Sequence, residues 1–307
     1  WYVAALPRPA DLRGYLFRRI GYRHIVAAVE LRRGQSVTAA DGDRGPDGGS
    51  GPRHDSQSNA FRLDQIDALI VRTMPPGSLE QVVFRMDCLL TLQNAGVTVL
   101  NPPKSVECAV DKYLCTSRLA AAGLPVPNTI VCENSEAALD AFDQLGGDVV
   151  VKPVFGSEGR GILRVSDPDL ALRTFRTLER IQAVIYLQEY IPHQGFDTRL
   201  LVLDRRVIGA IRRHNERDFR TNVSRDGKPV AHIPTDQEAE LAIRSADAVG
   251  TRFAGVDLLE RRDGSCSVVE VNAVPGWRAF SRVTRIDVAS RLLDALRESL
   301  DPGDRSP

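Results

Sequence analysis

The stretch Val151-Lys-Pro-Val-Phe-Gly-Ser-Glu-Gly-Arg-Gly-Ile162 joins a short apolar strand to a loop rich in glycine. Gly156, Gly159 and Gly161 fall within six positions, and such a loop can bring backbone N–H groups close to phosphate oxygens. The spacing matches neither a P-loop nor a dinucleotide-binding fingerprint, because no helix pattern follows directly. From spacing alone, a phosphate-binding loop and a plain hairpin turn are both open.

Two polar features lie beside this loop. Lys152 is inside the apolar strand, where an unpaired ammonium is costly to bury, so it has a partner or extends its stem to the surface. The run over 184–191 reads as a second apolar strand that ends in Gln188 and Glu189. This polar pair can present its edges to an adenine, or it can be an ordinary strand end.

Three oxygen-bearing side chains lie on two strands of an expected hairpin nearer the C-terminus. Asp257 is in the strand over 254–260, and Glu270 and Asn272 are in the strand over 268–272. Residues i and i+2 of a strand share a face, so all three side chains can meet on one face. Carboxylate and amide oxygens suit Mg²⁺. Ion pairs with arginines and a solvated polar face are the alternatives.

A group of arginines precedes this hairpin. Asp197 and Arg199 form a charged pair at i and i+2. Clustered guanidinium groups can clamp phosphates or carboxylates through paired hydrogen bonds, and an exposed charged loop is the alternative for each arginine. The further members of the group are Arg212, Arg213, Arg217 and Arg220.

The first hundred residues predict a small α/β domain. A strand over 66–71, a helix over 78–94 with a capping-box start and a strand over 97–100 follow one another, which is typical of a parallel strand–helix–strand unit. The segment 37–60 is dense in glycine, aspartate and serine. We expect it to be a flexible loop on this domain, with a linker between domains as the alternative.

Beyond this domain, helices alternate with antiparallel hairpins, which indicates a larger α+β region. The expected hairpins cover 200–212 and 254–271. The expected helices cover 105–122, 167–178, 236–250 and 288–300.

The composition is that of a folded protein without a dominant charge. The 307 residues include 40 lysines and arginines and 40 aspartates and glutamates, so the formal net charge is zero, which argues against a protein built around nucleic-acid backbones. No apolar run is long enough for a transmembrane helix, and no secretory signal is visible after Trp1, where the native start is left open. Five cysteines without metal-binding spacing favour a cytoplasmic protein.

Taken together, eight short motifs in this order resemble the ATP-grasp superfamily, and within it the RimK-type α-L-glutamate ligases. They are DKYLCT from Asp111, VKPVFGSEGRGI from Val151, QEYI from Gln188, DTR from Asp197, AIRR from Ala210, FRTN from Phe219, AGVDL from Ala254, and VEVN from Val269 with PG at Pro275. The resemblance implies an ATP-grasp fold, α/β plus α+β. A leading α/β domain over 1–104 would precede two α+β subdomains, over 105–190 and 191–307, that clasp ATP.

The resemblance also implies which residues bind ATP. Lys112 and Lys152 would hold the phosphates, and Asp197 would face the ribose or the phosphates. The mobile loop over the phosphates would be Gly156, Ser157, Glu158, Gly159, Arg160 and Gly161. The adenine pocket would be lined by Gln188, Glu189, Tyr190 and Ile191.

The remaining roles that the resemblance implies concern metal, catalysis and substrate. Two Mg²⁺ ions, which Mn²⁺ can replace, would be held by Asp257, Glu270 and Asn272. Arg199 and Arg213 would stabilise the transferred phosphoryl group. The amino-acid substrate would be gripped by Arg220 and Asn222.

The reaction that the resemblance implies is ATP-dependent joining of L-glutamate to a small-molecule acyl acceptor through an acyl phosphate. The enzyme would act without nucleic acid or membrane, as a dimer or tetramer. The segment 74–87 is similar to a subgroup that attaches glutamate to tetrahydromethanopterin, which implies a pterin acceptor. Ala273 and Val274 depart from the serine pair of many relatives, which weakens the inference of glutamate. The alternatives are a ligase of the same superfamily that uses another amino acid or a protein C-terminus, and a non-catalytic nucleotide-binding module.

Overall fold

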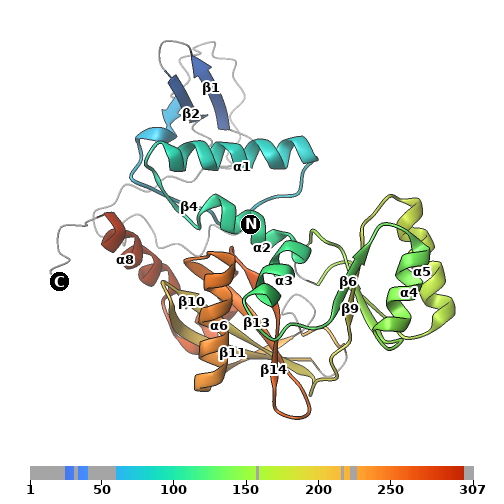
Figure 1. Ribbon diagram of the computed structural model, residues 1–307. Helices are drawn as coiled ribbons and strands as arrows, with labels where there is room; N and C mark the ends of the chain where they lie inside the picture. The colour runs from blue at the N-terminus through green and yellow to red at the C-terminus, as the bar shows by residue number, and fades with distance from the viewer. Residues whose placement is uncertain are drawn as a thin grey trace, which may run out of the picture. The chain divides into compact units, whose positions relative to one another are not determined.

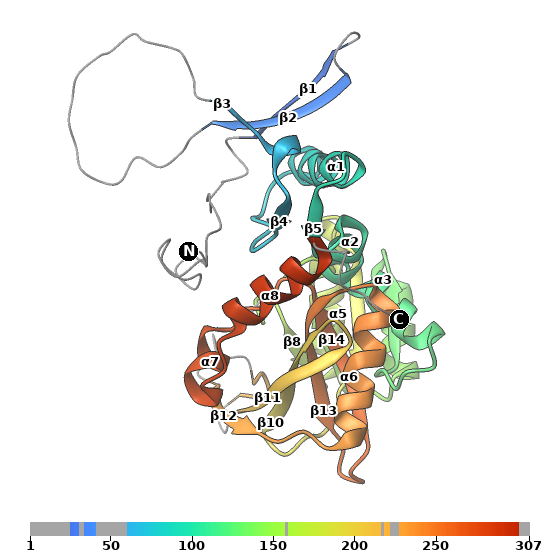
Figure 2. The same ribbon diagram turned by 90° about the vertical axis from the view of Figure 1, so that its left-hand side faces the viewer.

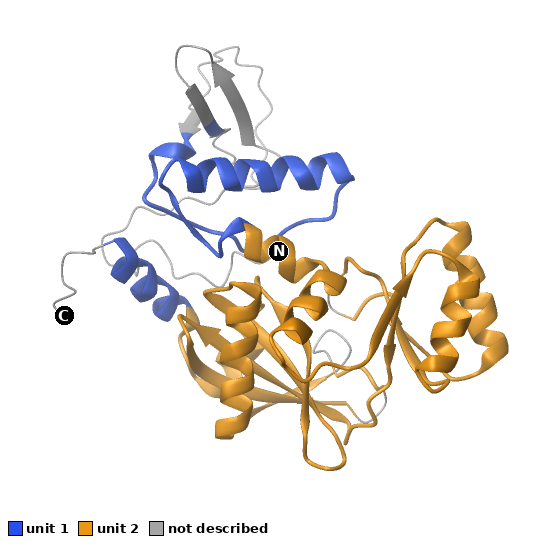
Figure 3. Ribbon diagram, in the orientation of Figure 1, with its two compact units in different colours: residues 1–103, 289–307 blue, residues 104–288 orange. Residues whose placement is uncertain are grey.

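The computed structural model describes residues 25–30, 34–40, 60–156, 159–215, 218–221 and 227–300. Two compact units divide the chain, unit 1 over 1–103 and 289–307 and unit 2 over 104–288 (Figure 3). The three-part division expected from the sequence, over 1–104, 105–190 and 191–307, stays a proposal. Outside the described residues lie most of the expected flexible loop (41–59), Ser157, Glu158 and Asn222.

Unit 1 combines a small antiparallel sheet with a parallel strand–helix–strand unit (Figure 1). The parallel strands β4 (Ala68–Ile70) and β5 (Thr98–Leu100) are connected by α1 (Leu79–Asn94), as the sequence predicts. A complete capping box between Ser78 and Gln81 begins this helix. The other elements are β1 (Ile25–Glu30), β2 (Gly34–Ala40), β3 (Ala60–Arg62), η4 (Leu63–Gln65) and, from Ala289 onward, α8 (Val288–Leu300).

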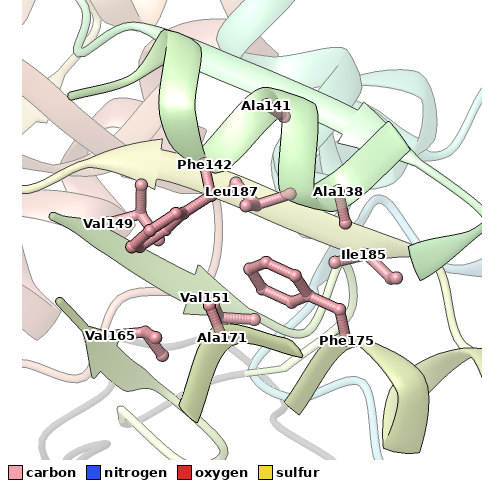
Figure 4. Close-up of a cluster of buried hydrophobic side chains, with 10 residues drawn as sticks. All are labelled: Ala138, Ala141, Phe142, Val149, Val151, Val165, Ala171, Phe175, Ile185 and Leu187. Carbon is pink, nitrogen blue, oxygen red and sulfur yellow. The ribbon is translucent and has the colours of Figure 1, made fainter. Parts of the chain in front are cut away.

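The first sheet of unit 2 has four antiparallel strands in the order β6-β9-β7-β8. Helices α4 (Ser135–Gln144) and α5 (Pro168–Arg180) cover one face of it (Figure 4). The phenyl rings of Phe142 and Phe175 meet edge to face in that core, with centroids 6.4 Å apart. The strands are β6 (Thr129–Cys132), β7 (Val149–Lys152), β8 (Leu163–Val165) and β9 (Ile185–Glu189).

The alternation of side chains along β7 and β9 separates the core from the opposite face. Val149 and Val151 enter the core under the helices, so Lys152 must point to the other side of the sheet. On β9, Ile185 and Leu187 enter the same core, which leaves Gln188 on the face of Lys152. The period of two therefore brings a lysine and an amide together from strands distant in the sequence.

The second sheet of unit 2 has five antiparallel strands in the order β12-β11-β10-β13-β14 (Figure 2). Helix α6 (Asp236–Val249) packs across four of these strands, and α7 (Arg278–Thr284) packs on β11 and β12. The strands are β10 (Phe196–Leu203), β11 (Arg206–His214), β12 (Lys228–His232), β13 (Phe253–Glu260) and β14 (Cys266–Asn272). The hairpins expected from the sequence, β10–β11 and β13–β14, are confirmed.

The prediction of one helix over 105–122 is wrong. The structure has two helices, α2 (Pro103–Val110) and α3 (Lys112–Ala121), separated by Asp111. Asp111 has an extended backbone, and its side chain accepts a hydrogen bond from the N–H of Leu114, which makes it the N-cap of α3. This aspartate, a residue type that favours the N-cap position, was the signal in the sequence that could have revealed the break between the two helices. The break places Lys112 in the first turn of a new helix.

Candidate active site

A pocket in unit 2 lies between its two sheets and brings together most of the residues singled out from the sequence. Its lining combines polar and charged side chains with apolar side chains of β7, β13 and β14. The lining residues are Lys112, Pro127, Val150, Lys152, Pro153, Gly156, Gly159, Arg160, Ile162, Gln188, Glu189, Tyr190, Ile191, His193, Asp197, Phe219, Arg220, Thr221, Asp257, Leu259, Val269 and Glu270.

Lys112 joins α3 to the glycine-rich loop. Its Nζ donates to the carbonyl of Gly156 at 2.8 Å, and its backbone N–H donates to the carbonyl of Val154 at 3.3 Å. Burial lowers the pKa of its ammonium, against the attraction of Glu270. The lysine is thus held at the edge of the loop, where it also faces the pocket.

Lys152 approaches the pocket from the first sheet. Its Nζ donates to Oε1 of Gln188 at 2.6 Å. Burial lowers the pKa of Lys152 to about 8; Glu270 and Asp257 oppose this shift, and Lys112 adds to it. The sequence left two possibilities for Lys152, a partnered ammonium or a stem that extends to the surface. The structure has the first, and the partner is a neutral amide.

The amide of Gln188 is oriented by its own hydrogen bonds. Its Nε2 donates to Oγ1 of Thr129 at 3.0 Å and to the hydroxyl of Tyr186 at 3.2 Å. These acceptors hold the carbonyl oxygen of the amide toward Lys152. Gln188 lines the pocket, as the adenine hypothesis requires, but the contact that the structure adds is with this lysine.

Four charged residues of the second sheet form a buried network that strand register creates. Asp197 pairs with Arg213 across β10 and β11, and Arg199 pairs with Asp257 across β10 and β13. Arg199 donates from Nε and Nη2 to the two carboxylate oxygens of Asp257, both at 2.6 Å. Arg213 donates to both oxygens of Asp197 and, at 2.9 Å, to Oδ2 of Asp257. Asp257 therefore forms ion pairs with arginines, which was one of the alternatives that the sequence left open for this residue.

Burial alone would raise the pKa of the Asp257 carboxyl, but Arg199 and Arg213 outweigh it and hold the pKa below its usual range. Burial likewise opposes the charge of Arg213, and Asp257 and Asp197 raise its pKa above the ordinary value. Asp257 and Arg213 thus keep each other ionised. Asp197 and Asp257 line the pocket, whereas Arg199 and Arg213 are not among its lining residues in the described part of the chain.

The residues expected to hold metal have a donor set that fits Mg²⁺. Asp257 and Glu270 lie opposite each other on β13 and β14, and both line the pocket. A carboxylate has about four acceptor positions, and the arginines use three of those on Asp257. Asn272 instead accepts a hydrogen bond from the N–H of Val274 at 2.8 Å and is not a lining residue. Among the described residues, no group of three His, Cys, Asp or Glu side chains is arranged for a metal, so two carboxylates carry the proposal.

Glu189 links the end of the first sheet to the second. Its carboxylate accepts from Asn128 at 2.7 Å and from Arg261, in the β13–β14 turn, at 2.6 Å. Burial would raise the pKa of this carboxyl, and the hydrogen bonds from Arg261 and Asn128 lower it below the usual value. Arg261 was not predicted as a site residue, because nothing in a hairpin turn reveals a partner 72 positions away.

An aromatic group lies beside Glu189. Tyr190 has the guanidinium of Arg164 over its ring at 3.5 Å and meets Phe219 edge to face at 6.2 Å. His193, whose pKa burial lowers, contacts the carbonyl of Phe219 through Nε2 at 3.0 Å. Phe219 and His193 line the pocket and were not predicted as site residues. No pattern in the sequence could have identified His193, whereas Phe219 begins the motif FRTN but was given no role of its own.

Arg220 connects two segments at the pocket. It pairs with Asp218 at 2.6 Å, and its Nη1 donates to the carbonyl of Ile162 at 3.3 Å. Gly159 and Arg160 also line the pocket, whereas Gly161 is not among the lining residues of the described chain. The predictions for Ser157, Glu158 and Asn222 fall outside the described residues.

Comparison with known proteins extends this picture. A family model described as the RimK-like ATP-grasp domain matches residues 109–296. A tetrahydromethanopterin:alpha-L-glutamate ligase from Methanosarcina acetivorans is 35% identical over 266 residues, which covers 78% of this chain and 82% of that protein. A probable alpha-L-glutamate ligase from Mannheimia succiniciproducens is 30% identical and covers 80% of this chain and 81% of that protein.

Among solved structures, the ATP-grasp ligase PsnB complexed with minimal precursor, Mg and ADP has a similar fold, with a TM-score of 0.68 at 21% sequence identity. The similarity covers 95% of this chain and 92% of that protein. Within the described part of this chain, no helix has both the length and the apolar character needed to cross a membrane.

Proposed function

The chain belongs to the RimK-like ATP-grasp family of ligases, and we propose that it joins L-glutamate to a tetrahydromethanopterin-type pterin while ATP is converted to ADP and phosphate. The observation that carries the ligase function is the pocket in which Lys112, Lys152, Asp257 and Glu270 meet. The choice of glutamate and pterin rests on relatives that bear these substrates in their names and are 32–35% identical to the chain.

ATP fits the mixed apolar and charged lining of the pocket. Val150, Ile162, Leu259 and Val269 offer an apolar slot for the adenine base. Lys112 and Lys152 supply positive charge for the phosphates, and Glu189, held ionised by Arg261, can accept hydrogen bonds from the ribose or the base. The backbone of the loop at Gly156 and Gly159 would close over the phosphates.

Mg²⁺ completes the proposed phosphate site. Asp257 and Glu270 would hold it, with Asn272 as a third oxygen ligand once its side chain turns from Val274. When bound, the metal would neutralise phosphate charge, and we propose two ions, with Mn²⁺ able to substitute. Arg199 and Arg213 would keep the Asp257 carboxylate ionised and oriented, which makes them positioning residues in the ligand-free site.

The reaction that we propose has two steps. A carboxylate oxygen of the acceptor bonds to the γ-phosphorus of ATP as the bond to ADP breaks, which gives an acyl phosphate. The amine of glutamate then bonds to the acyl carbon, loses a proton, and the C–O bond to phosphate breaks. The two lysines would lower the repulsion between the incoming carboxylate and the phosphate oxygens.

Water has to be kept from the acyl phosphate until the amine attacks. We propose that the glycine-rich loop is the lid, because Lys112 anchors it through Gly156. Arg220 and Asn222 would bind the carboxylates of glutamate. The substrates would be small molecules, and a homo-oligomer, dimer or tetramer, and a cytoplasmic location complete the proposal.

The experiment that tests this function measures release of ADP with ATP, Mg²⁺ and each of a panel of amino acids, with and without a reduced pterin acceptor. Mass spectrometry of the product gives the added residue. We expect release that requires both L-glutamate and the pterin. Release with glutamate that ignores the pterin would refute the proposed acceptor, and ATP binding without release under any combination would refute the ligase function.

A further inference from the structure

Two exposed aromatic residues are next in the chain to residues that line the pocket. Tyr113 is 55% exposed in the first turn of α3, after Lys112, and Phe155 is 68% exposed before Gly156. Val110 and Leu114, close to Tyr113 in the chain, are also exposed. Exposed apolar side chains that gather in one place often mark a binding surface.

Backbone contacts hold the two aromatic residues on neighbouring segments. The N–H of Lys112 donates to the carbonyl of Val154 at 3.3 Å, and Tyr113 and Phe155 are the next residues along each chain segment. Nζ of Lys112 also donates to Gly156 at 2.8 Å. Lys112 and Gly156 both line the pocket, so the backbone of Tyr113 and of Phe155 lies one residue from a lining position.

The chemistry of the three proposed substrates decides which of them this surface fits. The adenine of ATP already has an apolar slot between β7 and β14, at Val150 and Val269. Glutamate is small and charged and has no apolar face to bury. A reduced pterin acceptor keeps one planar ring, the pyrimidinone, for which offset stacking on aromatic side chains is favourable.

We propose that Tyr113 and Phe155 form an aromatic platform on which the planar ring of the acyl acceptor stacks. The inference rests on the proposed function, because it takes a pterin as the acceptor. The platform borders the lysine that would hold the phosphates, so an acceptor bound on it can extend its carboxylate into the pocket. It is a specificity-determining surface for the acceptor and leaves the binding of ATP and glutamate to other residues.

The test compares the wild-type chain with the double variant Tyr113→Ser/Phe155→Ser. We expect KM for the reduced pterin to rise about tenfold, with KM for ATP and glutamate within twofold of wild type. Equilibrium dialysis of the pterin without ATP gives the same comparison without chemistry. The ring-preserving variant Tyr113→Phe/Phe155→Tyr should restore the KM, whereas Tyr113→Leu/Phe155→Leu, apolar but not flat, should restore it only in part.

The matched control is Ile181→Ser/Ile233→Ser, which removes two apolar side chains of unit 2 that are 67% and 90% exposed. It should leave every KM unchanged. If the wild-type chain does not ligate the pterin, the proposed acceptor is wrong and the platform falls with it. If it does, an unchanged pterin KM in the serine variant overturns the platform alone. A change of oligomeric state with an unchanged KM would assign the surface to a contact between copies, and full rescue by leucine would refute stacking.

Discussion

The two sheets that border the pocket carry their charges in different ways. On the second sheet, Asp197, Arg199, Arg213 and Asp257 pair with one another, so the network is neutral before any ligand arrives. On the first sheet, the ammonium of Lys152 donates to a neutral amide, and burial has lowered its pKa to about 8. Glu270 and Asp257 attract this ammonium but do not offset its burial, so the charge of Lys152 is less fully compensated than the charges of the network.

The difference separates two uses of buried charge. Paired charges hold a geometry, since removing one partner leaves the other without compensation in a poorly solvated place. The ammonium of Lys152 donates to an amide, and the attraction of Glu270 and Asp257 does not offset its burial, so an anion that binds there would add compensation that the ligand-free site lacks. We expect substitutions in the second-sheet network to reduce stability, and a substitution at Lys152 to reduce activity without reducing stability.

The largest expected effect follows from opening the neutral network. Asp257→Asn removes the carboxylate that compensates Arg199 and shares Arg213, and we expect the free energy of unfolding to fall by on the order of 3 kcal/mol. Urea denaturation measures this change. Ligation should also be lost, because the same carboxylate is a proposed metal ligand.

The matched control for that substitution is Asp204→Asn, in the turn between β10 and β11 of the same unit. Asp204 pairs with both nitrogens of Arg252 at 2.7 and 2.8 Å, but this pair is partly exposed. Loss of this pair should lower the free energy of unfolding by less than about 1 kcal/mol. Equal destabilisation by the two variants would contradict the view that the Asp257 network is special.

The second effect concerns activity alone. Lys152→Met keeps the length of the stem and removes the charge, so turnover should fall by about 10²–10³-fold. The free energy of unfolding should stay the same or rise, because a buried ammonium is replaced by an apolar group. Steady-state kinetics and urea denaturation on one preparation give both values. Lys104→Met, at an exposed lysine, should change neither turnover nor the free energy of unfolding. A strong loss of stability in Lys152→Met would contradict the proposed difference between the two sheets.

Local patterns in the sequence predicted much of the fold. Alternating apolar residues and turn signals identified the β10–β11 and β13–β14 hairpins, and the capping box at Ser78 marked the start of α1. The helix over 105–122 was wrong because apolar spacing continues across Asp111, and only the capping aspartate reveals the break.

The partners of the site residues were less predictable than the residues themselves. Asp257 was found, but its arginine partners depend on register between β10, β11 and β13, which no short window contains. Gln188 was assigned to the adenine pocket. Nothing near it in the sequence shows that its side chain contacts Lys152, which lies 36 positions earlier on the neighbouring strand. Long-range pairing is therefore the information that the structure adds.

The third effect distinguishes two roles for Asp197, a ligand of ribose and a partner of Arg213. The carboxylate is 7% exposed and pairs with both guanidinium nitrogens that face it. If it orients Arg213, Asp197→Asn should lower kcat about tenfold and leave KM for ATP unchanged. If it binds ribose, KM for ATP should rise and the preference for ATP over 2′-deoxy-ATP should disappear. The two nucleotides are compared in the same assay, and we expect the first outcome.

The smallest expected effect is a dependence on pH that again sets the two sheets apart. As the pH rises from 7 to 9, Lys152 loses its proton, and the affinity for ATP should fall by up to about tenfold. The free energy of unfolding should change in the opposite direction and increase with pH. Between about pH 8 and 10.5 the folded chain binds fewer protons at this lysine than the unfolded chain, so the free energy of unfolding rises with pH.

Calorimetric titration of ATP with Mg²⁺ at pH 7, 8 and 9 measures the first slope, and urea denaturation from pH 7 to 10 measures the second. Lys152→Met should lose both slopes, because the titrating group is gone. Lys112 is the competing source, since burial lowers its pKa as well. If both slopes persist in Lys152→Met and vanish in Lys112→Met, the titrating group is Lys112 at the start of α3 and not Lys152 of the first sheet.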